Sequence, residues 1–208
     1  MNRRDFLRRA YKIGGLAALY NLGISNTEVK AWLTMGPTQS SAAVCEIVQQ
    51  TEDGASGGSS SVGNASNKYF ASKFSYSGTN GKAICKGSAW LEKVGSPTRD
   101  YFIKLYTNDA VPDPDEPDTL IGTSDAIDSS SVAASEEKVT VTFSVPSSAL
   151  TNGTAYHVVL YTATNDADNY LKWHLTDGTT ESIVYSDDGS TWTYESASKT
   201  QKFELVSE

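Results

Sequence analysis

Residues 138–145 read KVTVTFSV, an alternation of polar and apolar side chains over eight residues. Successive side chains of a β-strand point to opposite faces, so the four apolar residues of this stretch share one face. One face in a core and one in water is the pattern of an antiparallel sheet that packs against a second sheet. The stretch therefore favours an all-β fold.

Seven other runs have an alternating or β-rich composition, and turn sequences built on Gly, Asn and Asp separate them. No long amphipathic helical pattern interrupts these runs. We therefore predict an all-β fold, an antiparallel two-sheet β-sandwich of jelly-roll type, with an N-terminal helical signal-like segment. The predicted strands are 69–76, 83–94, 101–107, 138–145, 155–163, 170–175, 181–185 and 199–206.

The first residues match an export signal. The twin-arginine pattern has two arginines, any residue, Phe-Leu and a basic residue, and the chain supplies Arg3, Arg4, Phe6, Leu7 and Arg8 at these positions. This match predicts that the twin-arginine export machinery is a partner of the chain. The protein would then be exported, to the periplasm, the cell surface or the extracellular space. A basic amphipathic helix that docks on the domain is the alternative interpretation.

The chain divides into three predicted parts. Residues 1–31 form the signal-like segment, and Ala31 is the favoured cleavage position. Its apolar run is shorter than the roughly 20 residues that a membrane-spanning helix needs, so no stable transmembrane span is expected. Residues 32–67 form an N-terminal extension whose Gly- and Ser-rich part is predicted to be a flexible loop. Residues 68–208 form the sandwich.

The charge is strongly acidic outside the signal-like segment. The chain has 17 basic and 25 acidic residues, a net charge of −8. Without residues 1–31 it keeps 11 basic and 23 acidic residues, a net charge of −12. Phosphate binding needs clustered basic residues, so this composition argues against a nucleic-acid partner.

The two cysteines, Cys45 and Cys85, are predicted to form a disulfide if the protein is exported, because export places them in an oxidising compartment. The bond would close a loop of about 40 residues and contribute roughly 3–4 kcal/mol in the chain-entropy model. Two buried thiols are the alternative. Two cysteines without a paired histidine give no convincing zinc site.

An acidic loop, DPDEPD at 113–118, is a candidate calcium site. Its carboxylates are the hard oxygen ligands that calcium prefers, although their spacing is not that of an EF-hand. A solvated acidic loop is the alternative, and no other cofactor is expected. The candidate metal ligands are Asp113, Asp115, Glu116 and Asp118.

Two tryptophans are candidates for ligand stacking, since an exposed indole ring can pack on a sugar or on an apolar side chain. Trp90 and Trp173 have the polar neighbours Glu92, Lys172 and His174, which place these strands near solvent. His174 is itself a candidate ligand contact. The alternative for each tryptophan is an ordinary core position.

No catalytic motif stands out. The one Gly-x-Ser-x-Gly spacing, at 54–58 (GASGG), lies within the Gly- and Ser-rich segment, and the two histidines form no His-rich metal pattern. Most acidic residues lie beside Gly, Pro, Ser or Asn, where turn formation accounts for them. The protein is therefore predicted not to be an enzyme.

Six sequence elements follow one another over roughly residues 68–206: 90–97 (WLEKVGSP), 103–106 (IKLY), 120–124 (LIGTS), 141–143 (VTF), 150–160 (LTNGTAYHVVL) and 186–192 (SDDGSTW). Their order resembles the choice-of-anchor R type of β-sandwich domain. The resemblance implies a jelly-roll-related sandwich in a bacterial or archaeal surface or secreted protein. It implies no catalytic residue, because the family has none that defines it.

Together these observations predict an exported, non-catalytic module of the cell surface or extracellular space, structural or binding a glycan or protein. One alternative is a virion or appendage subunit that keeps residues 1–35 as an arm for self-assembly. Another is a secreted carbohydrate-active enzyme, which would need two carboxylates opposed across a cleft.

Overall fold

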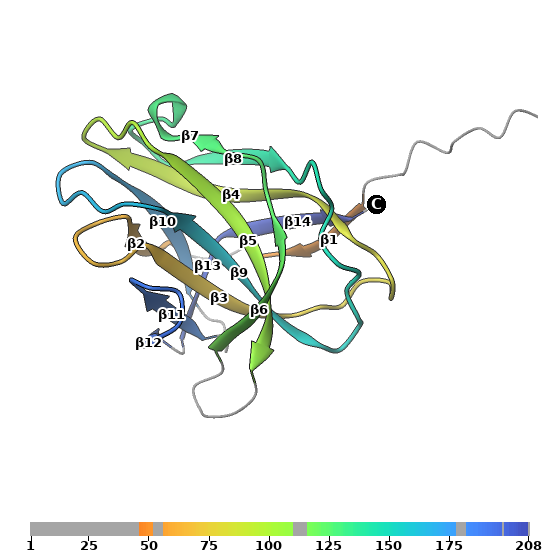
Figure 1. Cartoon of the computed structure of the whole chain (residues 1–208). Helices are drawn as coiled ribbons and strands as arrows, with labels where there is room; N and C mark the ends of the chain where they lie inside the picture. The colour runs from red at the N-terminus through yellow and green to blue at the C-terminus, as the bar shows by residue number, and fades with distance from the viewer. Residues whose placement is uncertain (1–45, 52–55, 110–115, 178–181, 197, 208) are drawn as a thin grey trace, which may run out of the picture. The chain divides into compact units, whose positions relative to one another are not determined.

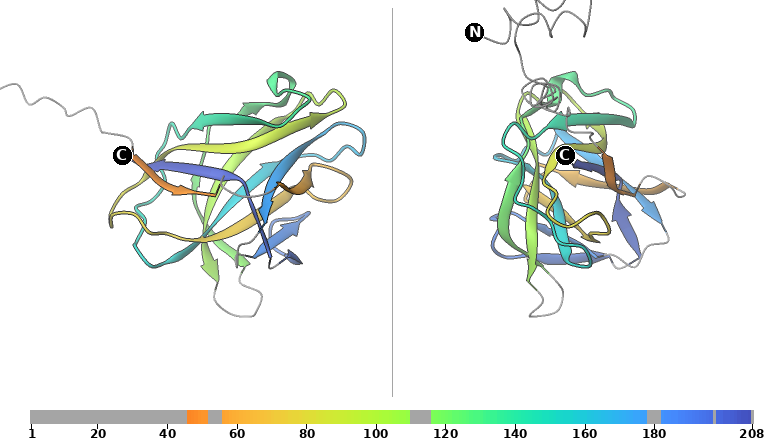
Figure 2. Two further views of the ribbon diagram at one scale, coloured as in Figure 1. Left: turned by 180° about the vertical axis from the view of Figure 1, so that it is seen from behind. Right: turned by 90° about the vertical axis from the view of Figure 1, so that its right-hand side faces the viewer.

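The structure is a computed structural model that describes residues 46–51, 56–109, 116–177, 182–196 and 198–207. These residues form two antiparallel sheets packed face to face (Figure 1; Figure 2). The predicted all-β, two-sheet sandwich is confirmed. Within the described residues the one helical element is the 3₁₀ turn Ser129–Ser131, and no helix is long and apolar enough to cross a membrane.

The first sheet, called sheet I here, has the central order β1-β14-β4-β10-β13, and β2 and β8 pair with β10 and β4. Its strands are β1 (Glu46–Gln50), β2 (Ser56–Val62), β4 (Ile84–Val94), β8 (Glu137–Thr142), β10 (Tyr170–Asp177), β13 (Lys199–Gln201) and β14 (Phe203–Ser207).

The second sheet, sheet II, has the order β12-β11-β3-β9-β5-β6, and β7 pairs with β5. Its strands are β3 (Tyr69–Ser75), β5 (Asp100–Asp109), β6 (Glu116–Thr123), β7 (Ile127–Asp128), β9 (Ala155–Thr162), β11 (Ile183–Ser186) and β12 (Thr193–Ser196).

The main core lies between the sheets, and the longer strands contribute alternate residues to it, as β5 does with Tyr101, Ile103 and Leu105. Tyr101 shows how polar atoms are satisfied there. Its hydroxyl donates to the Val62 carbonyl oxygen at 3.2 Å and accepts from the Leu171 N–H at 3.2 Å, which joins the two sheets. Burial raises the pKa of Tyr101 to about 12, so the hydroxyl keeps the proton that it donates.

A second hydrophobic cluster lies on the outer face of sheet II. Trp192 folds back from the β11–β12 turn and packs edge-on against Tyr69, with the ring centroids 5.9 Å apart. Tyr69 stacks on Tyr161, and the Lys104 ammonium lies over the Tyr161 ring, 3.7 Å from its centroid. The remaining members of the cluster are Ala71, Tyr106, Val159 and Val184.

The prediction that the Gly- and Ser-rich segment is a flexible loop is wrong for residues 56–62. They form β2, which pairs along β10. A side chain at Gly57 would meet Asp177 Oδ1 at 2.8 Å, and the buried Ser60 hydroxyl accepts from Gln201 Nε2 at 3.0 Å. Small residues let this strand lie close to its neighbours, and the sandwich therefore begins earlier than residue 68.

Two further expectations need correction. The strand predicted at 138–145 ends at Thr142, where the chain turns towards Asp125, which accepts from the Ser144 hydroxyl at 2.7 Å. Phe143 is buried as predicted, but Val145 is 78% exposed. The acidic stretch was expected to be a loop, yet its last residues, from Glu116, begin β6.

Candidate ligand-binding face

The outer face of sheet I carries a half-buried tryptophan among charged side chains. On β4, Ala89 and Leu91 point into the core, so Trp90 and Glu92 point outwards. The same alternation turns the charged residues of β10 outwards. The ion-pair face, as we call it, consists of Trp90, Glu92, Glu136, Lys138, Lys172, His174, Lys202 and Glu204.

Each carboxylate of this face contacts a lysine. Lys172 Nζ donates to Glu92 Oε1 at 2.8 Å, and Lys202 Nζ donates to Glu136 Oε1 at 2.8 Å. Lys138 Nζ lies 2.8 Å from Glu204 Oε2. The pairs connect β4, β8, β10 and β14, so the face has a defined arrangement of charge over several strands.

His174 lies between the first two pairs. Its Nε2 is 3.2 Å from Glu92 Oε2, and its Nδ1 is 3.3 Å from Glu136 Oε2. A neutral imidazole carries one N–H, so only the protonated ring faces both carboxylates with a hydrogen. His174 therefore links the two pairs electrostatically when it is charged.

Trp90 lies beside this network. The Lys138 ammonium is 4.9 Å from the centre of the Trp90 ring, which is within the range of a cation–π contact. The backbone N–H of Trp90 donates to the Lys202 carbonyl oxygen at 3.3 Å, which fixes the chain beneath the ring. The indole is thus held next to fixed charges while part of it stays accessible.

The prediction that Trp173 lies near solvent is wrong. Trp173 is fully buried in the core between the sheets. Its Nε1–H donates to the Lys202 carbonyl oxygen at 2.8 Å. Lys172 and His174 do point outwards, and in a strand this turns the residue between them inwards.

Glu92 is not arranged as a general acid. The hydrogen bond from Lys172 is the main cause that holds the pKa of Glu92 below its usual value. A glycosidase acid needs a raised pKa so that it is protonated when it acts. The contacts of Glu92 therefore do not suit the role of the acid in glycoside hydrolysis.

Some of the predicted residues fall outside the described part of the chain. The export-signal residues Arg3, Arg4, Phe6, Leu7 and Arg8 lie there, as does Cys45. Cys85 is buried on β4, and its Sγ donates to the Val206 carbonyl oxygen at 3.4 Å. The disulfide stays a prediction.

The calcium prediction is also left open. Asp113 and Asp115 lie outside the described residues. Glu116 and Asp118 are on β6, where Asp118 Oδ2 accepts from the Thr107 hydroxyl at 3.2 Å. Across the described ranges no group of three or more His, Cys, Asp or Glu side chains is arranged to hold a metal.

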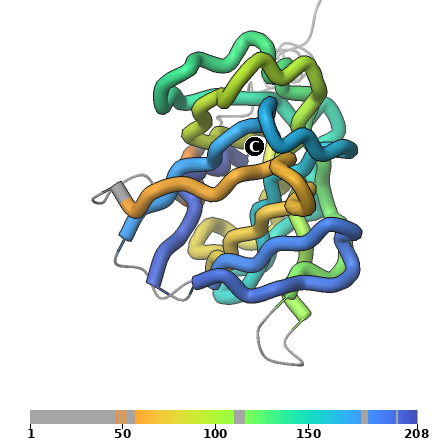
Figure 3. The backbone as a smooth tube through the Cα atoms, turned by 90° about the vertical axis from the view of Figure 1, so that its left-hand side faces the viewer, coloured from red at the N-terminus to blue at the C-terminus, as the bar shows by residue number. Residues whose placement is uncertain are grey.

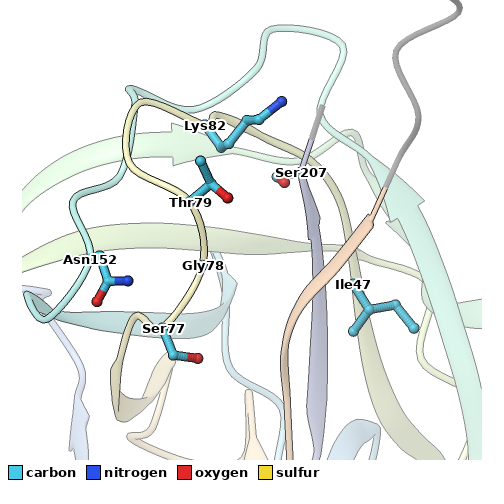
Figure 4. Close-up of a pocket in the computed structure, with 7 residues that line it drawn as sticks. All are labelled: Ile47, Ser77, Gly78, Thr79, Lys82, Asn152 and Ser207. Atoms are coloured by element: carbon cyan, nitrogen blue, oxygen red, sulfur yellow. The ribbon is translucent and has the colours of Figure 1, made fainter.

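A polar pocket of about 380 Å³ lies where the β3–β4 loop approaches β1 and β14 (Figure 4). Lys82 is the one charged residue among the described residues of its lining, and its ammonium points away from the space between the other side chains (Figure 4). Ile47 on β1 is 56% exposed and forms part of the wall. Nothing in this lining directs a specific contact into the pocket, so it is a weaker candidate than the ion-pair face.

The sequence was compared with protein-family models and with curated proteins. No protein-family model matches the chain, and no curated protein matches it. The interpretation of the site therefore rests on its geometry.

Trp90 and His174 are the two residues of the ion-pair face that the sequence predicted as ligand contacts, and Glu92 and Lys172 were named only as their polar neighbours. The sequence analysis did not single out the other four residues, Glu136, Lys138, Lys202 and Glu204. Lys138 and Glu204 could have been found, because each is a charged residue next to apolar residues in a predicted strand. Glu136 and Lys202 lie just before β8 and β14, and only the fold brings them together.

Proposed function

We propose that this protein is an exported, non-catalytic β-sandwich module that binds a glycan or protein at the ion-pair face. The observation that carries the proposal is the half-buried Trp90 indole beside the charge network of β4 and β10. Tryptophan is enriched at binding hot spots because it offers a large apolar surface together with one N–H donor. Since the charges extend over four strands, the face suits an extended partner better than a small metabolite.

The export part of the proposal rests on the twin-arginine pattern at Arg3 and Arg4, and on the resemblance to choice-of-anchor R domains. The acidic composition of the remaining chain agrees with it, because such a chain has little affinity for nucleic acid. A protein at the cell surface needs a face that recognises its surroundings, and the ion-pair face supplies one.

We expect Trp90→Ala to weaken binding to a glycan array, or to surface proteins purified from the native source, by about 30-fold or more. The indole supplies most of the apolar contact, and truncating a hot-spot residue costs 2 kcal/mol or more, about a 30-fold loss of affinity. The melting temperature should change little. Phe102→Ala is the matched control, since it removes a half-buried aromatic ring from the outer face of sheet II.

Equal binding by Trp90→Ala and the wild type would refute the assignment of the face. Turnover of a glycan or peptide, lost on substitution of one carboxylate, would instead support the carbohydrate-active alternative.

Replacing Arg3 and Arg4 together with lysine should leave the protein inside the cell. Lysine keeps the positive charge but lacks the planar guanidinium that the export machinery recognises. The measurement is cell fractionation followed by immunoblotting, with Arg8→Lys, outside the arginine pair, as the control. Intact mass from the native source adds an independent check, since a chain that keeps Met1 would support the assembly-arm alternative.

A further inference from the structure

A second polar pocket lies at the edge of the sandwich, between the β2–β3 turn and the β11–β12 hairpin. Figure 3 shows these two segments, orange and blue, on the same side of the fold. The pocket has a volume of about 300 Å³. Its wall includes Tyr185 on β11, Asp187 and Thr191 in the hairpin turn, Thr193 on β12 and Asn67 in the β2–β3 turn.

The hairpin turn that forms one wall is held in a fixed conformation. Asp188 Oδ1 accepts from the N–H groups of Ser190 and Thr191, both at 2.8 Å. These backbone hydrogen bonds hold the pKa of Asp188 far below its usual value, and they join the carboxylate to the backbone of the turn. A side chain at Gly189 would meet the Tyr69 ring at 2.9 Å, which shows how closely the turn packs on sheet II.

One of the two carboxylate oxygens of Asp187 has polar partners that fix the side chain in place. Its Oδ1 accepts from Asn165 Nδ2 at 2.9 Å and lies 3.3 Å from the Lys68 ammonium. Its Oδ2 has no hydrogen-bond partner within the part of the chain that the structure describes, and the side chain is 53% exposed. One carboxylate oxygen at the pocket is therefore held in place and available to a ligand.

Other polar groups of the lining are also available to hydrogen-bond a ligand. Among the described residues, no side-chain hydrogen bond occupies the amide of Asn67 or the hydroxyls of Tyr185, Thr191 and Thr193. Hydroxyl and amide groups both donate and accept, as the hydroxyls of a sugar do. The half-buried Tyr185 ring packs against Phe70, with the centroids 5.6 Å apart, and gives the pocket an aromatic wall.

Charge narrows the class of ligand. Asp187 and Asp188 repel an anion, whereas Lys68 already compensates Asp187 and so weakens the attraction for a cation. The uncharged hydroxyl and amide groups of the lining therefore suit a neutral ligand that offers several hydroxyl groups.

We propose that this pocket binds one neutral sugar unit, with Asp187 Oδ2 accepting from its hydroxyls and Tyr185 lining its apolar side. The volume lies at the lower end of the range for small-molecule sites, which fits a single ring. The pocket is lined by the β2–β3 turn and the β11–β12 hairpin, and none of its lining residues belongs to the ion-pair face, so this proposal is independent of the function proposed above.

The test is a titration of the full chain with the methyl glycosides of glucose, galactose, mannose and N-acetylglucosamine, followed by amide chemical shifts. We expect at least one glycoside to shift the amides of 66–67 and 185–193. Asp187→Asn keeps the shape but replaces a charged acceptor, so it should weaken binding about tenfold or more. Asp168→Asn is the matched control, because it removes the charge of an exposed carboxylate outside the pocket lining and should leave the affinity unchanged.

Binding that survives in Trp90→Ala separates this site from the ion-pair face and supports the proposal. Three results would overturn it: no shift with any of the four glycosides, shifts that Asp187→Asn does not weaken, or the same shifts on addition of calcium alone. Melting curves of both variants establish that they remain folded.

Discussion

Trp173→Ala should lower the free energy of unfolding by about 3–5 kcal/mol, the cost typical of removing a fully buried aromatic side chain from a core. Trp173 has no exposed surface, and its loss leaves a cavity between the sheets. The Lys202 carbonyl oxygen also loses the shorter of its two hydrogen bonds, the one from the indole. Urea denaturation followed by circular dichroism measures the change.

Trp90→Ala is the control for this prediction, because it removes the same side chain from the partly accessible outer face. Its cost should be about 1 kcal/mol or less, as for other surface substitutions. Comparable losses in the two variants would contradict the placement of Trp173 in the core. If Trp173→Ala fails to fold, Trp173→Phe can replace it, because phenylalanine fills part of the space that the indole occupies. Trp173→Phe should still lower the free energy of unfolding more than Trp90→Phe does.

Gly95→Ala should be the second strongly destabilising substitution, although the residue is exposed. Gly95 has a φ of +68°, and a Cβ there would overlap the carbonyl oxygen of Asp168. The left-handed backbone conformation costs about 1–2 kcal/mol for alanine. Forced displacement of the β9–β10 loop adds a further ~1–3 kcal/mol.

Gly153→Ala separates these two contributions. Gly153 is also exposed and has a φ of +77°, but nothing lies within 4 Å of a Cβ at this position. Alanine there should cost only the backbone contribution. Thermal unfolding of both variants measures the difference, and equal melting temperatures would show that the close approach at Gly95 has no energetic weight.

The alternation of polar and apolar residues along the chain made most of the strands predictable. The runs 69–76 and 155–163 agree with β3 and β9 to within one residue. The segment of β2 gave no such signal, because SGGSSSV contains one large apolar residue and forms a strand through its backbone pairing with β10. Such a strand depends on its neighbours, and local composition predicts a loop.

The sequence analysis predicted both Trp90 and Trp173 to lie near solvent, yet the alternation of side chains along a strand distinguishes the two residues. Trp173 stands between Lys172 and His174, which point to solvent, so it points inwards. Trp90 stands between Ala89 and Leu91, which are buried, so it points outwards. Polar neighbours in a strand therefore indicate burial of the residue between them.

The charge network was only partly predictable. Glu92, Lys172 and His174 lie in predicted strands, and their shared face follows from the strand period. Glu136 and Lys202 come from segments 66 residues apart in the chain, and their pairing follows from how the ends of β8 and β14 meet. No local sequence pattern predicts this pairing of Glu136 with Lys202.

The Lys202 carbonyl oxygen accepts from both the Trp173 indole and the Trp90 backbone N–H, and the Lys202 N–H donates to the His174 carbonyl oxygen at 2.8 Å. Three bonds to β4 and β10 thus hold the backbone at the point where β13 gives way to β14. The Lys202 side chain that pairs with Glu136 therefore extends from a fixed backbone position. The same hydrogen bonds fix the backbone of Trp90 and His174. A partner that docks here meets groups already in position, so little conformational entropy is lost in ordering the backbone beneath them.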